Sequence, residues 1–251
     1  MLRWLDLQAA AFPKASVRLQ AKALRTRLAN RPRWGRSNYE AAVKAQGFSI
    51  APPADKSWRW CDMSNGRGGY SCALWTLFHT TLANVARPNA AEALRTIALW
   101  VNDFFGCDEC ARHFLQYYDA HRGHDVGGGQ IGAVLWLWRA HNAVTSRLRD
   151  EELRADGSPS ERPARFPLDA DCVDCFNETA ADGSTDHSIF EYLQEVYCFE
   201  SDTYAHAQPA HEQCTACAHT PRPPALLLRT PTHGHSFQPC RHPPWRAGAT
   251  S

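Results

Sequence analysis

The stretch best suited to chemistry is a Cys-x-x-Cys pair, Cys107 and Cys110, followed by His113. Two thiols at this spacing can close a small disulfide ring, open it again and pass on two electrons. We expect the pair to begin a helix, where unpaired N–H groups and the positive end of the helix dipole favour a thiolate. Cys110 and His113, at i and i+3, would share one helical face. A structural disulfide or half of a zinc site explains the pair equally well, so its neighbours must decide.

Two further stretches place aromatic and polar side chains on one helical face. Trp75 and His79 stand at i and i+4 within a helix expected over residues 72–87. A second stripe, at i, i+3, i+4 and i+7, consists of Trp138, His141, Asn142 and Thr145. Such a stripe suits a wall that stacks on and hydrogen-bonds a flat heterocycle, because polar groups in a plain core would each need a buried partner. A core aromatic with a hydrogen-bonded histidine, or a solvated face, is the simpler alternative.

Net charge, cysteine content and hydropathy indicate which classes of partner and compartment to expect. The formal net charge of +1 over 251 residues gives no electrostatic reason to expect nucleic acid or an anionic membrane as partner. Ten cysteines, with three Cys-x-x-Cys spacings, favour an oxidising compartment or thiol chemistry. No stretch approaches the roughly 18 apolar residues of a membrane span. Residues 1–13 lack the pattern of a signal peptide, and an N-terminally incomplete chain would reconcile that with the cysteine content.

The apolar spacing predicts a chain made of helices. Asn89 and Asp186 are expected to cap two of them, and residues 151–165 are expected to form a loop. Cys61 and Cys72 bracket a ten-residue loop that a disulfide would stabilise by about 3 kcal/mol; two free buried cysteines are the alternative. The expected helices cover two segments within residues 1–30, then 39–45, 72–87, 89–105, 107–120, 130–149 and a last one from about 186 to 198.

Four stretches, in this order, resemble the Erv/ALR flavoprotein domain of quiescin-sulfhydryl oxidases. The first is residues 67–79 (RGGYSCALWTLFH), which resembles the first helix of that domain. Residues 104–114 (FFGCDECARHF) are similar to its redox motif, and residues 135–148 (LWLWRAHNAVTSRL) to its flavin-binding helix. Phe166-Pro167, followed by Cys172 and Cys175, is similar to the segment that closes the domain. The resemblance covers about residues 57–200.

This resemblance implies an all-α fold: an Erv/ALR-type four-helix bundle with an additional short helix, preceded by linker helices and followed by a disordered tail. The implied divisions are a helical linker over residues 1–55, the oxidase domain over 56–200 and a Pro/His-rich tail over 201–251. The implied activity is FAD-dependent oxidation of thiols to disulfides, with oxygen reduced to hydrogen peroxide, in support of oxidative protein folding. Implied partners are protein or small-molecule thiols, molecular oxygen and a thioredoxin-like electron donor. The implied location of the full-length protein is the secretory pathway or outside the cell.

The resemblance also assigns roles to residues. Cys110 would be the thiol beside the flavin, and Cys107 the thiol that receives electrons from outside. The disulfides would be Cys61–Cys72, Cys107–Cys110 and Cys172–Cys175. The cofactor contacts would be Arg67, Trp75, His79, His113, Trp138, His141, Asn142, Val144, Thr145 and Phe166.

The chain departs from the family pattern at several points. Thr145 stands where the family usually has Asn, Phe166 where it has Trp, and one extra residue separates Arg67 from Cys72. The family's thioredoxin-like domain has no counterpart upstream, so we expect this chain to be the C-terminal half of such a protein.

Two other classes of protein remain open. A structural zinc module could use Cys107/Cys110 with Cys172/Cys175, or Cys214/Cys217 with His219. However, 61 residues separate the first two pairs, against about 15–20 in common zinc ribbons. An inactive flavin-fold interaction protein is the other alternative.

Overall fold

The computed structural model describes residues 1–31, 33–48, 69–160, 163–176 and 184–198, and within them every regular element is a helix. The α-helices are α1 (Leu2–Ala11), α2 (Ala15–Ala29), α3 (Arg36–Ala45), α4 (Gly69–Asn84), α5 (Ala90–Phe104), α6 (Asp108–Ala120), α7 (Gly129–Asp156) and α8 (Ser184–Tyr197). Short 3-10 turns are η2 (Arg87–Asn89), η3 (Gly123–Asp125) and η4 (Val173–Phe176). The expected Pro/His-rich tail, residues 201–251, lies outside the described residues.

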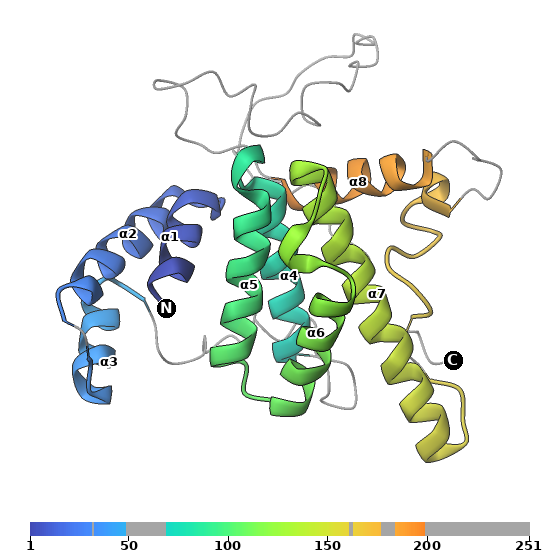
Figure 1. Ribbon diagram of the computed structural model, residues 1–251, viewed down its shortest axis with the longest axis horizontal. Coiled ribbons are helices and arrows are strands. Elements are labelled where there is room, and N and C mark those ends of the chain that lie inside the picture. The colour runs from blue at the N-terminus through green and yellow to red at the C-terminus, as the bar shows by residue number, and fades with distance from the viewer. Residues whose placement is uncertain (32, 49–68, 161–162, 177–183, 199–251) are drawn as a thin grey trace, which may run out of the picture.

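Helices α4 to α7 run side by side as a four-helix bundle, and α8 lies across one end of it, in contact with α4 and α7 (Figure 1). Helices α1 to α3 lie at the side of the bundle, where α1 packs against α5 and α4. This arrangement confirms the expected all-α bundle with an additional helix and preceding linker helices.

The bundle is held by a core to which all four of its helices and α8 contribute. Along α5, apolar positions at helical spacing place Leu94, Ile97 and Val101 inside. Burying each such side chain stabilises the fold by about 1.5–3 kcal/mol. The largest fully buried aliphatic side chains are Leu82, Leu94, Ile97, Leu137, Ile189, Leu193 and Val134.

A second, smaller core joins α1, α2 and α3. Its buried members are Leu5, Ala21, Leu24, Leu28 and Ala42. Helix α1 serves both cores, because Leu7 and Ala11 pack into the bundle while Leu5 packs against α2. The linker helices are therefore attached to the bundle through opposite faces of one short helix.

Helix α7 is longer than the sequence pattern predicted. The expected loop over residues 151–165 begins six residues late, because Glu151, Glu152, Leu153 and Arg154 favour a helix. An ion pair between Arg147 and Glu151 at i and i+4, 2.5 Å long, supports the extension. The helix ends where Gly157 takes a left-handed conformation with φ +68° and donates its N–H to Leu153 O at 2.9 Å.

The structure confirms the position of one expected cap and contradicts the other. Asn89 occupies the N-cap position of α5, but its side chain makes no capping hydrogen bond. Asp186 lies inside the first turn of α8, which begins at Ser184, so the prediction of Asp186 as its cap was wrong. The Asp186 carboxylate instead accepts a hydrogen bond from Arg139 of α7 at 2.5 Å and ties α8 to the bundle.

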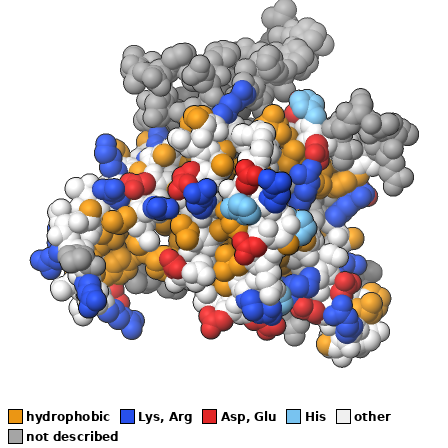
Figure 2. Space-filling view, in the orientation of Figure 1, with side chains coloured by type: hydrophobic (Ala, Val, Ile, Leu, Met, Phe, Trp, Pro, Cys, Tyr) orange, Lys and Arg blue, Asp and Glu red, His pale blue; other side chains and the backbone are white. Residues whose placement is uncertain are grey.

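Charges of both signs are interspersed on the face where α5, α6 and α7 lie (Figure 2). Several form short-range pairs along one helix, such as Arg112 with Glu109 on α6 and Arg147 with Glu151 on α7. Within the described part of the chain, no helix combines the length and apolar character needed to cross a membrane.

The turn that leads into α7 depends on a close backbone approach at Gly132. A Cβ at this position would stand 1.7 Å from Gly127 O, which no rotation of a side chain could relieve. Only glycine therefore lets the loop fold back onto the first turn of α7.

We predict that Gly132→Ala destabilises the protein by about 1–3 kcal/mol, although alanine is the better helix former. Chemical denaturation measures the change. Gly106→Ala is the matched control, because a Cβ there meets no atom within 4 Å. Equal stability of the two variants would contradict the proposed steric limit.

Candidate active site

The redox pair stands at the start of α6, as predicted. Cys107 is the N-cap residue, with extended backbone, and its sulfur accepts the Cys110 N–H at 3.3 Å. Cys107 and Cys110 form a disulfide with a Cα–Cα distance of 5.3 Å. Because Cys107 sulfur caps the helix, a thiolate there would face an N–H donor and the positive end of the dipole.

One helical turn beyond Cys110, Phe114 connects the redox pair to α4. The Phe114 ring lies 6.2 Å from the Trp75 ring, centroid to centroid. Trp75 in turn stacks on His141 of α7, with centroids 4.4 Å apart and planes within 7°. The two aromatic stretches singled out in the sequence therefore meet face to face, and Phe114 of the helix that carries the disulfide lies beside them.

His141 also pairs with His79, which is buried, whereas His141 is partly buried. His79 Nε2 and His141 Nδ1 are 3.2 Å apart, and His79 is 2% exposed. Burial lowers the pKa of His141 to about 4, and burial together with His141 lowers the pKa of His79 well below its usual value. Both rings are thus neutral near pH 7, so one nitrogen of the pair donates and the other accepts.

Polar groups of α7 hold the segment that follows it. Asn142 donates to Phe166 O at 2.8 Å and accepts the Phe166 N–H at 2.7 Å. Trp138 Nε1 also donates to Phe166 O, at 2.6 Å. The Phe166 ring, only 7% exposed, is thereby placed 5.3 Å from the His141 ring and 5.8 Å from the His79 ring.

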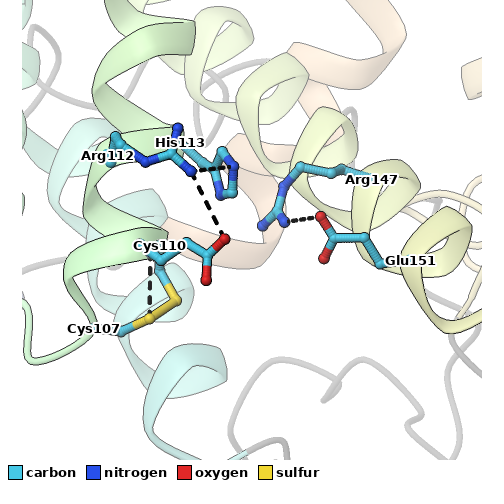
Figure 3. The surroundings of a disulfide bond; sticks show 7 residues. Cys107, Cys110, Arg112, His113, Arg147 and Glu151 are labelled. Atoms are coloured by element: carbon cyan, nitrogen blue, oxygen red, sulfur yellow. Dashed lines mark hydrogen bonds and ion pairs between the residues drawn. A yellow bond between two sulfur atoms is a disulfide. The ribbon is translucent and has the colours of Figure 1, made fainter. Parts of the chain in front are cut away.

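A groove of about 290 Å³ separates α6 from α7 beside this cluster. Figure 3 shows the His113 ring and the Arg147 guanidinium pointing into the space between the two helices. The other lining residues are Gln116, Tyr117, Ala120, Ala143 and Val144. Nδ1 of His113 is buried and has no hydrogen-bond partner among the residues that the structure describes.

All but one of the expected cofactor contacts that the structure describes fall into two groups, and Arg67 lies outside the described residues. Trp75, His79, His141 and Phe166 form one aromatic cluster, which Trp138 and Asn142 support through Phe166. His113 and Val144 line the groove. Thr145 belongs to neither group, because its hydroxyl donates to His141 O of its own helix at 3.1 Å.

The other cysteines among the described residues are also paired. Cys172 and Cys175 form a disulfide on η4, which packs against α8, and Cys175 is fully buried. Cys72 is disulfide-bonded, whereas Cys61, its expected partner, lies outside the described residues. Cys198 is disulfide-bonded as well.

Three residues near the site had no role in the sequence analysis. Tyr197 of α8 stacks on His79 with centroids 5.1 Å apart, and burial raises the pKa of its hydroxyl. The spacing alone could have indicated two of them as neighbours of the site. Phe114 follows Cys110 by one helical turn, and Arg147 follows Val144 by three residues. Tyr197 carried no such signal, because the contact joins helices more than 100 residues apart.

The fold and the disulfide at the start of α6 define a known class of domain. Residues 72–163 match the model of the Erv1/Alr family. This confirms the resemblance drawn from the four sequence stretches.

Within that class, the chain is similar to sulfhydryl oxidase 1. It is 40% identical to the Homo sapiens protein over 123 residues, which cover 44% of this chain and 15% of the relative. It is 30% identical to the Gallus gallus protein over 223 residues, covering 82% of this chain and 29% of the relative. The chain therefore spans less than a third of the length of these relatives.

A solved structure agrees with both comparisons. The sulfhydryl oxidase fragment of human QSOX1 superposes with a TM-score of 0.64 and 27% sequence identity. The match covers 77% of this chain and 81% of that fragment.

The His79–His141 pair predicts a pH dependence of stability. Unfolded His141 takes up a proton near pH 6.5, but folded His141 does so only near pH 4. The unfolded state therefore binds more protons between these values, and stability is lost as the pH falls through that window. We expect His141 to account for a loss of about 2–3 kcal/mol between pH 7 and 4.5.

Urea denaturation at several pH values tests this expectation. His141→Gln, which cannot titrate, should show a shallower loss of stability than the parent over pH 6.5 to 4.5. His124→Gln, at an exposed histidine, is the matched control and should follow the parent. A His141→Gln slope equal to that of the parent would show that this ring does not carry the effect.

Proposed function

We propose that the chain is an FAD-dependent thiol oxidase that converts pairs of thiols to disulfides and reduces oxygen to hydrogen peroxide. One observation carries the proposal. Within the Erv1/Alr domain, Phe114 follows the Cys107–Cys110 disulfide by one helical turn, and its ring lies against the aromatic cluster built by α4 and α7. A disulfide beside an aromatic wall is the arrangement that exchange of two electrons between thiols and a flat cofactor requires.

The residues present fit a flavin. Trp75, His141 and Phe166 offer flat aromatic faces, and His113 offers a buried nitrogen without a partner. A bound heterocycle would give that nitrogen an acceptor and would stack on the aromatic faces. FAD, when bound, supplies a two-electron acceptor that is reoxidised by oxygen. The proposed FAD contacts are Arg67, Trp75, His79, His113, Trp138, His141, Asn142, Val144, Thr145 and Phe166; for Thr145, the hydroxyl is already used within α7.

The thiol chemistry is carried by the pair itself. A substrate thiolate attacks Cys107 sulfur, the Cys107–Cys110 bond breaks, and Cys110 leaves as a thiolate. A second substrate thiol then attacks the mixed disulfide, which releases an oxidised substrate and leaves Cys107 and Cys110 both reduced. The two electrons taken from the substrate thus reside on the pair until they pass to the cofactor and on to oxygen.

The positions of the two thiols support the roles that the family resemblance implies for them. Cys110 lies inside α6, on the same face as Phe114, which contacts Trp75 of the aromatic cluster. Cys107 lies before the first turn, farther along the chain from that contact. We therefore assign Cys110 to the cofactor side and Cys107 to the incoming substrate.

The proposal also covers the division of the chain, its substrates and electron donor, and its location. We propose residues 1–55 as a linker region, 56–200 as the oxidase domain and 201–251 as a tail, supported by the separate small core of α1 to α3. By similarity to sulfhydryl oxidase 1, we propose protein or small-molecule thiols as substrates and a thioredoxin-like donor of electrons. The same similarity supports a role in oxidative folding in the secretory pathway.

The zinc alternative is less well supported. It needs free thiolates at Cys107, Cys110, Cys172 and Cys175, but each pair is closed as a disulfide. Within the described residues, no three His, Cys, Asp or Glu side chains are grouped as metal ligands would be. The alternative with Cys214, Cys217 and His219 lies outside the described residues.

We predict that the purified chain is yellow, binds FAD and oxidises dithiothreitol with about one peroxide formed per disulfide. Oxygen consumption, peroxide assay and visible absorbance measure these outcomes together. A double variant, Cys107→Ser with Cys110→Ser, is the control and should retain bound FAD while turnover falls to background. A flavin-loaded parent that oxidises no dithiol would refute the proposed activity.

The assignment of the two thiols gives a separate prediction. Cys107→Ser should stop turnover but leave Cys110 able to produce a thiolate-to-flavin charge-transfer absorbance band. Cys110→Ser should stop turnover and remove that band, because its remaining thiol lies on the substrate side. A band in Cys110→Ser that is missing from Cys107→Ser would reverse the assignment.

A further inference from the structure

Arg112 of α6 links a carboxylate to the histidine of the groove. Its Nη2 lies 3.0 Å from His113 Nε2 and 3.7 Å from Glu109 Oε1 (Figure 3). Its Nη1 donates to Gln116 Oε1 at 3.2 Å. The guanidinium is thus held on three sides by side chains of its own helix.

The contact with Arg112 determines where His113 carries its proton. A guanidinium has only N–H donors and no acceptor, so Nε2 of His113 must be the acceptor of this hydrogen bond. A neutral imidazole has one protonated nitrogen, and here that nitrogen must be Nδ1. Arg112 therefore selects one of the two tautomers of the ring.

The nitrogen left to donate is the one without a partner. Nδ1 of His113 is buried, and no acceptor within the described residues reaches it. A buried donor without a partner destabilises the free protein. The neighbouring wall of the groove offers the apolar Ala143 and Val144, and Arg147, which can only donate and is paired with Glu151. A ligand that carries an acceptor would satisfy the nitrogen.

We propose that Arg112 is a positioning residue: it holds His113 Nε2 as an acceptor, so that Nδ1–H is fixed as a donor to the cofactor in the groove between α6 and α7. The inference rests on the proposed function, because it takes FAD as the ligand. FAD carries ring nitrogens and carbonyl oxygens that accept hydrogen bonds. The polar contacts of Arg112 with the described residues are with side chains of α6, and Arg112 acts through His113.

The tautomer can be read directly by NMR. In protein labelled with ¹⁵N-histidine, long-range correlation spectra distinguish protonated from unprotonated ring nitrogens, and His113→Gln identifies the signal. We expect the parent to carry its proton on Nδ1. Arg112→Met removes the donor, so a form protonated on Nε2 should appear.

Release of flavin from the loaded protein provides the second measurement. When flavin fluorescence is followed after dilution, Arg112→Met should release FAD about tenfold faster than the parent, as expected for one weakened hydrogen bond of a buried group. Arg112→Lys, which keeps a donor, should lie between the two. Arg36→Met is the matched control, since it also removes an exposed arginine from an i, i+4 pair, and should release flavin at the parent's rate.

Two results would overturn the proposal. One is a parent protein with His113 protonated on Nε2, and the other is an Arg112→Met variant that releases flavin at the parent's rate. A parent that takes up no FAD would instead refute the proposed function. The tautomer of His113 in that parent would still decide whether Arg112 orients the ring.

Discussion

The site depends on burying polar rings between α4 and α7 without leaving them unpaired. Trp75 stacks on His141, and His141 forms a hydrogen bond with His79. Each of the two helices thus provides a partner for the polar rings of the other. An unpartnered buried group would cost about 1–3 kcal/mol, which is a large share of the stability of a domain. Because α6 packs against the same stack through Phe114, the start of α6 and its disulfide are placed beside it.

Much of this was accessible from residue spacing. The pair at Cys107 and Cys110 was expected to begin a helix, and α6 does begin directly after Cys107. The spacing of Trp138, His141 and Asn142 indicated a face that needed polar partners, and each of them has one. Local periodicity is reliable here because amphipathic helices of this length bury one face, whatever their partners are.

The partners themselves were not accessible. Asn142 bonds the backbone of Phe166, 24 residues away, and Tyr197 covers His79 from a helix late in the chain. Such contacts depend on how the loop after α7 returns to the bundle, which no helical period encodes. Asp186 shows the same limit: its type suggested a cap, but tertiary structure uses it as the partner of Arg139. The proposed flavin contacts at His113 and Val144 stay a prediction, although the fold places both in one groove.

The histidines of the site differ in whether a buried ring nitrogen is left without a hydrogen-bond partner. In the His79–His141 pair, one ring nitrogen carries the proton that the other accepts, so this contact is complete within the protein and stabilises the bundle. At His113 the neighbour is a guanidinium, which occupies Nε2 as an acceptor and leaves a buried donor at Nδ1. A ring that is half satisfied by a cation on its own helix is poorly suited to hold helices together. It is well suited to select a ligand, because binding then gains a hydrogen bond that the free protein lacks.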